Sequence, residues 1–192
     1  MGDLAWIVLS SMLVNNFTLV MFLGLCSFIG VTQQVSTAFR LGLANTFVLV
    51  ITAFSAWFLN KYVLGAAPFL RTIAFIIVIG SAVQVVEMAV RKHYPVLFRQ
   101  LGIYLPLITT NCAILGLAIF QSNRGYNLIQ GLAFALGAGA GLTIALSTMA
   151  SIRMRTELST VPSLMRGMGI VLVIASFLSM AFMGFAGLFS AA

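Results

Sequence analysis

Charged side chains are what this sequence most lacks. They make up 7% of its 192 residues, whereas apolar residues make up 61%. Soluble domains carry about 25% charged residues, so this composition excludes a soluble globular domain. Acidic residues are scarcest, with three against ten basic ones. The only acid deep in an apolar stretch is Glu87, and Arg91 follows it at ion-pair spacing, so no unpaired carboxylate is expected within the apolar stretches.

Cysteine is rarer still. The chain has two, Cys26 and Cys112, which do not make a disulfide framework, and they form no CxxC pair. The N-terminus also lacks the basic segment of a signal peptide. It carries Asp3 instead and continues into an apolar run longer than a signal sequence needs. We therefore expect this first apolar run to remain in the protein as a helix.

Long gaps between charges indicate the fold class. Most of them provide the roughly 20 apolar residues that cross about 30 Å of hydrocarbon. The sequence predicts an all-α polytopic membrane protein with one transmembrane domain, residues 1–192, and no soluble domain. Six helices are expected, at 4–25, 39–60, 70–90, 98–120, 127–150 and 168–189.

The basic residues occupy alternate connections between these helices. The odd connections hold seven of the ten: Arg40, Arg91, Lys92, Arg99, Arg153, Arg155 and Arg166. The positive-inside rule then places the odd connections in the cytoplasm and both termini on the outer side. The same dispersed distribution argues against nucleic acid as a partner, although the net charge is +7. The long polar loop around Arg153, Arg155 and Arg166 either docks a cytoplasmic partner or only fixes the topology.

Helices one and four contain residues that interrupt a helix. The first has Asn15, Asn16, Thr18 and Gly24, and the fourth has Pro106, Thr109, Thr110, Asn111 and Gly116. Proline removes a backbone donor, and amides compete for backbone hydrogen bonds. We expect both helices to be broken and to point at a central site. Because each half has three helices, residues 1–95 and 96–192 would be inverted repeats; convergent membrane composition is the alternative.

Helix five carries a stretch of small residues, with glycine at positions 137, 139 and 141. Such surfaces allow two membrane helices to approach closely, and this interpretation is favoured over ligand binding.

Cys26 and Cys112 are the residues that would carry chemistry. Each alone is more typical of an inert buried thiol. Iron–sulfur clusters take four thiolates, so a metal site here needs two further ligands from a second copy or from a different protein.

Four sequence runs carry a resemblance to a known family: LVNNFTLVMFLGLC, LRTIAFIIVIGSAVQVVEM, LGIYLPLITTNCAILGLA and AFMGFAGL. They resemble the membrane-protein family that includes the A subunit of the Rnf (Rsx) electron-transport complex. The D and E subunits of the sodium-pumping NADH:quinone reductase belong to the same superfamily. The resemblance covers essentially the whole chain.

This resemblance implies six helices as two inverted halves and a place in the bacterial inner membrane. It also implies a translocase that moves H⁺ or Na⁺ as electrons pass between ferredoxin and NADH, in which this chain has no catalysis of its own. Its partners would be a sister membrane protein, the E subunit, together with the B, C, D and G subunits. The sisters would share one intramembrane [2Fe–2S] cluster, held here by Cys26 and Cys112.

Three neighbours of the cysteines, Ser27, Thr110 and Asn111, are candidates for hydrogen bonds that tune the cluster. They could equally cap the ends of broken helices, and the two roles are compatible. Two other functions remain open from the residues alone. One is a secondary transporter that binds a small solute between broken helices; the other is a membrane scaffold with inert thiols.

Overall fold

The computed structural model describes residues 2–14, 16, 18–31, 34–62, 71–93, 107–108, 110–157 and 167–189. All regular structure within these residues is helical, as the composition predicted. In chain order the elements are α1 (Gly2–Leu9), the π-helical η1 (Ser10–Val14), α2 (Leu25–Val31), α3 (Val35–Tyr62), α4 (Arg71–His93), α7 (Cys112–Asn123), α8 (Leu128–Glu157) and α9 (Met168–Phe189). Among them, α3 and α8 are long and apolar enough to cross a membrane.

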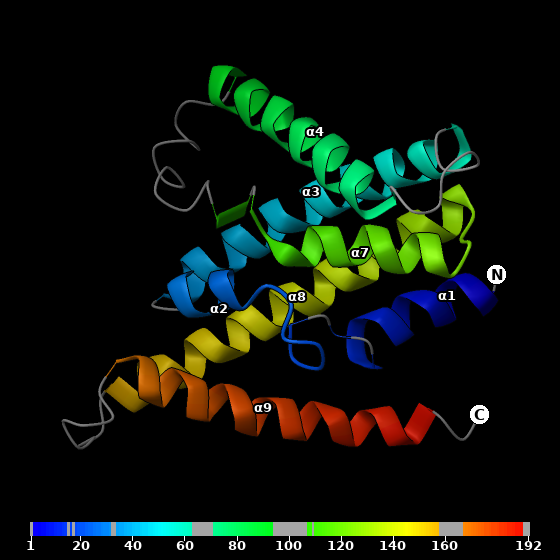
Figure 1. The fold of residues 1–192 in the computed structure, drawn as a ribbon. Helices are drawn as coiled ribbons and strands as arrows, with labels where there is room; N and C mark the ends of the chain where they lie inside the picture. The colour runs from blue at the N-terminus through cyan, green and yellow to red at the C-terminus, as the bar shows by residue number, and fades with distance from the viewer. Residues whose placement is uncertain are drawn as a thin grey trace.

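The two longest helices, α3 and α8, pack against each other at the centre of the bundle (Figure 1). A Cβ atom built on Gly42 of α3 would lie 2.6 Å from Thr143 Oγ1 of α8. A Cβ atom on Gly139 of α8 would lie equally close to Thr46 Oγ1 of α3. The earlier residue of one helix meets the later residue of the other, so the helices are antiparallel. Glycine is needed at both points because any side chain would push the helices apart.

The other two glycines of the small-residue stretch, Gly137 and Gly141, face the beginning of the chain. A Cβ atom on Gly141 would lie 2.8 Å from the carbonyl oxygen of Met12, and one on Gly137 would meet Val8 and Ser11. Both sides of the small-residue stretch are therefore close-packed. The expected packing role of residues 137, 139 and 141 is confirmed.

The first apolar run is interrupted as expected. Instead of one helix over 4–25, α1 and η1 end at Val14 and α2 begins at Leu25. Asn16 is buried in the break, where its Oδ1 accepts from the Thr18 backbone N–H at 3.2 Å. Its Nδ2 donates to the Gly141 carbonyl of α8 at 3.0 Å. The amide thus pairs a backbone N–H inside the break and ties the break to α8. Asn15 lies outside the described residues.

A second break precedes α7. Asn111 is extended, with φ −70° and ψ 117°, and acts as the N-cap, so a new helix begins at Cys112 rather than running through 98–120. Its Oδ1 accepts from the Ala113 backbone N–H at 3.1 Å. The stretch 94–106 and position 109, with Pro106 and Thr109, lies outside the described residues.

The expected boundaries are close for α3, α4 and α9 but wrong for α8. That helix was expected to end at 150 and continues to Glu157. Arg153 and Arg155 therefore lie on its last turns and not in a loop. Arginine is a good helix former, so a basic residue marks the limit of the apolar span without ending the helix. Arg166 is outside the described residues.

The helices α4 and α9 lie on opposite sides of the central pair, and α1 begins at the end of the bundle where α9 finishes (Figure 1). Their outer faces are apolar and exposed, as shown by Ile77 of α4 and Phe177 of α9, at 61% and 65%. Such faces suit contact with lipid.

Candidate functional site

Cys112 is the first residue of α7, and its side chain is exposed. Its Sγ accepts a hydrogen bond from the Gly24 backbone N–H at 2.8 Å. The N-terminus of a 12-residue helix also favours negative charge, because its first N–H groups are unpaired. Both features place positive partial charge beside this sulfur.

Cys26 is the second residue of α2 and lies two positions after Gly24. Its side chain is also exposed, and both thiols are free. Because the Gly24 N–H touches Cys112 Sγ, chain geometry keeps the Cys26 Cα within about 12 Å of that sulfur. The structure therefore places two cysteines that are far apart in the sequence in the same part of the molecule. Neither is enclosed by the core, in contrast to the inert buried thiol that each alone would suggest.

Gly24 shapes this site in a way that its sequence context did not predict. The sequence marked it only as a helix-breaking residue. In the structure it has φ +88°, a conformation that strains any other residue, and a Cβ atom there would lie 3.2 Å from Asn111 Oδ1. Its glycine identity thus permits the turn that aims its N–H at Cys112. A glycine two residues before a cysteine, in a broken helix, was the available signal.

Asn111 connects Cys112 to the central helix α3. While its Oδ1 caps α7, its Nδ2 donates to Asn45 Oδ1 at 3.3 Å. Both side chains are buried, and Asn45 Nδ2 has no hydrogen-bond partner among the described residues. Asn45 was also missed by sequence reasoning, although an amide in the middle of an apolar helix is a recognisable signal.

Ser27 and Thr110 have different surroundings. Ser27 is fully buried, and its Oγ has no hydrogen-bond partner in the described part of the chain. Its neighbour Cys26 is exposed, so the two side chains face different environments. Thr110 is exposed and directly precedes the N-cap of α7. The hydrogen bonds expected from both residues to a cluster stay predictions.

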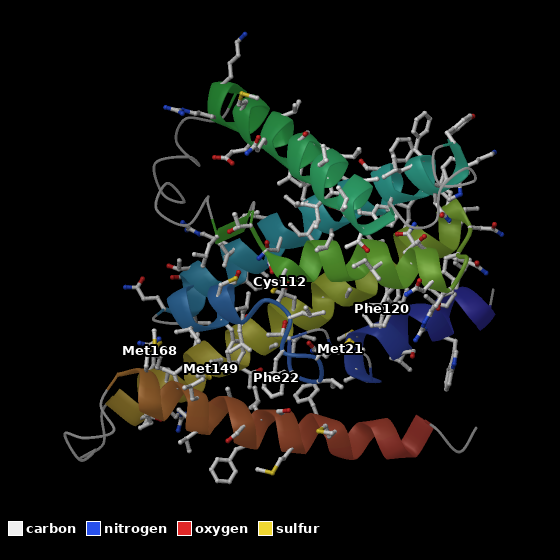
Figure 2. The ribbon with its side chains drawn as sticks, viewed as in Figure 1. Met21, Phe22, Cys112, Phe120, Met149 and Met168 are labelled. Atoms are coloured by element: carbon white, nitrogen blue, oxygen red, sulfur yellow. The ribbon has the colours of Figure 1, made fainter. Side chains whose placement is uncertain are left out.

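The segment that leads to Gly24 exposes apolar side chains. Met21 and Phe22, labelled with Cys112 in Figure 2, belong to the same irregular segment as Gly24. Both are exposed, and Phe22 has φ +55°, which is uncommon for a residue with a side chain.

The stability of the Asn111 contact can be tested directly. We expect Asn111→Ala to lower the free energy of unfolding in detergent by about 1–3 kcal/mol, because it removes a helix cap and leaves the buried Asn45 amide unpaired. Asn60→Ala is the control, since that exposed side chain only accepts from Ser122 Oγ. Thermal or denaturant unfolding measures the stability of both variants. Equal stability would contradict a stabilising role for the contact between Asn111 and Asn45.

In chemical terms the described residues hold no complete metal site. They contain no group of three or more His, Cys, Asp or Glu side chains that could hold a metal ion. The sequence contains no third cysteine, so any further thiolate at this site would come from outside the chain.

Broken helices packed on a glycine-rich central pair, with an apolar exterior, define an all-helical membrane protein. Comparison with known families leads to the same class of protein. The model described as "Rnf-Nqr subunit, membrane protein" matches residues 4–189, and the chain belongs to this family.

Several curated relatives cover nearly the whole chain. The A subunits of the "Ion-translocating oxidoreductase complex" of Syntrophotalea carbinolica and Alkalilimnicola ehrlichii are each 50% identical over 190 residues, 98% of both chains in each case. The protein of the same name from Edwardsiella ictaluri is 47% identical over 191 residues, again 98% of both chains. The family expected from the four sequence runs is confirmed.

Proposed function

We propose that this protein is a membrane component of an ion-translocating oxidoreductase complex, and that Cys26 and Cys112 supply two of the four thiolates of a [2Fe–2S] cluster. The observation that carries the proposal is the placement of two exposed thiols at two adjoining helix breaks, with the Gly24 N–H aimed at one of them. The names of the relatives support the complex. The sister protein, the E subunit of the Rnf complex, would contribute the other two thiolates.

The residues present fit half of such a cluster. A [2Fe–2S] centre takes four cysteine ligands, and this chain has two. A site shared between two proteins requires ligands that are exposed on each chain before assembly, and both thiols are exposed. The apolar Met21 and Phe22 would be covered by the partner. This arrangement would exclude water from the shared site.

When bound, the cluster supplies a one-electron relay through the membrane. This chain's own residues hold and tune that site. The Gly24 N–H and the positive end of α7 both stabilise charge at Cys112 Sγ, and such contacts raise the potential of an iron–sulfur centre. Asn111 keeps Cys112 in place by joining α7 to α3.

The two halves of the chain would be inverted repeats. Two kinds of contact recur in both. Asn16 and Asn111 each accept from the backbone N–H two residues later, and each donates to one central helix, α8 or α3. Likewise, Thr46 and Thr143 each donate to a glycine carbonyl four residues earlier. These recurrences favour a repeat over convergent composition.

The proposed membrane, topology, further partners and electron path follow from the charge pattern and the resemblance. The protein would lie in the bacterial inner membrane with six crossings and both termini periplasmic, and the B, C, D and G subunits would complete the complex. Electrons would pass between a cytoplasmic donor and flavins on the outer side, coupled to H⁺ or Na⁺ transport.

Deleting the sister protein tests the shared site. We expect dithionite-reduced membranes that contain the whole complex to show the EPR signal of this [2Fe–2S] cluster. Membranes that retain this chain but lack its E-subunit partner should not show it, because two thiolates cannot complete the coordination. Immunoblotting must confirm equal amounts of this chain. A full signal without the sister protein would show that the site is not shared in this way.

A further inference from the structure

The helix that carries Cys26 is unusually short. It has seven residues, Leu25–Val31, whereas isolated helices below about 12–15 residues are marginal. Its position must therefore be set by tertiary contacts. On one side Phe28 and Ser27 are buried in the protein. Near the C-terminal end of the helix, Ile29 also packs against the core and Gly30 lies beside Leu107.

Arg153 of α8 anchors that end. Its Nη1 donates to the Ile29 carbonyl oxygen at 3.3 Å across a separation of 124 residues, and the side chain is half-buried. Ile29 lies in the last turn of α2, where carbonyl groups have no partner within the helix. A cation at this end also interacts favourably with the negative end of the helix dipole.

We propose that Arg153 is a positioning residue for Cys26. Ile29 lies three residues after Cys26, which is less than one helical turn, so a displacement at Ile29 moves the whole of α2. The inference rests on the proposed function, because it gives Cys26 the role of a cluster ligand. Arg153 would thus act through the helix and without touching the cluster.

A topological role for Arg153 makes a different prediction. If only positive charge at the cytoplasmic end mattered, Arg153 and Arg155 would be equivalent, since both lie on the last turns of α8. Their side chains differ, however, because Arg155 is exposed and Arg153 reaches α2. Arg155 is therefore a matched control for charge, helix and depth.

The test compares Arg153→Gln, Arg153→Lys and Arg155→Gln in the purified complex. The readouts are the [2Fe–2S] EPR intensity per complex and the midpoint potential. We expect Arg153→Gln to lose most of the signal per complex, Arg153→Lys to retain more of it, and Arg155→Gln to match the unchanged protein. Equal signals and potentials in the two glutamine variants would overturn the proposal.

Two further comparisons keep the outcome clear. If Arg153→Gln prevents assembly, Arg153→Lys is compared with Arg155→Lys. A midpoint potential that changes only in the Arg153 variant supports the proposal, and identical potentials in the two variants refute it.

Cys26→Ser is measured in parallel. Loss of signal in Cys26→Ser with a normal Arg153→Gln complex refutes only the role of Arg153. Retention of signal in Cys26→Ser refutes the proposed function as well.

Discussion

The purified complex is expected to lose the EPR signal of the shared [2Fe–2S] cluster when Cys112 is replaced by serine, and again when Cys26 is replaced. A serine hydroxyl is a harder and more weakly binding ligand than a thiolate, and neither cysteine has a substitute, since the chain contains only these two. Electron flow through the complex should fall to background in both variants. EPR spectroscopy, iron and acid-labile sulfide content, and turnover of the complex measure the three effects.

A serine on another exposed helix provides the control. Ser176 of α9 donates only to the Val173 carbonyl, so Ser176→Ala should leave signal and turnover unchanged. The amount of assembled complex must be equal in all variants. If both cysteine variants kept the full signal, the thiols would not be ligands. A carrier that binds a solute between the broken helices, or a scaffold, would then be the better account.

The second large effect is expected at the crossing of α3 and α8. Gly139→Leu should strongly reduce the amount of folded protein in the membrane, because even a Cβ atom there would lie 2.6 Å from Thr46. Overpacking of this kind costs about 1–3 kcal/mol, and a leucine adds three more carbon atoms that need space. Thr143 and Gly42 form the neighbouring contact, so separating the helices disturbs both.

Gly80→Leu is the matched control for this substitution. Gly80 is also in the middle of an apolar helix, α4, but a Cβ atom there would meet nothing within 4 Å. Both changes replace glycine by a better helix former, so any difference between them reports packing and not helix propensity. Quantitative immunoblotting and thermal unfolding in detergent give the comparison. Equal loss in both variants would show that the crossing tolerates a larger side chain.

Much of the helical pattern could be predicted because it depends on local composition. The last helix, α9, spans the expected range, and the breaks before Leu25 and Cys112 occur where amides and glycine interrupt apolar runs. The end of α8 could not be placed in the same way. Charges report where the apolar span stops, whereas the helix continues as long as its backbone bonds are made, so Arg153 and Arg155 were assigned to the wrong element.

The sequence by itself determined that this is a helical membrane protein with only two thiols, because hydropathy and residue counts do not depend on how helices pack. Only the tertiary structure decided what those thiols meet. The contacts of Gly24 with Cys112, of Asn111 with Asn45 and of Arg153 with Ile29 join residues 88, 66 and 124 positions apart. Each depends on the crossing and register of separate helices, which side-chain packing sets and no local pattern encodes.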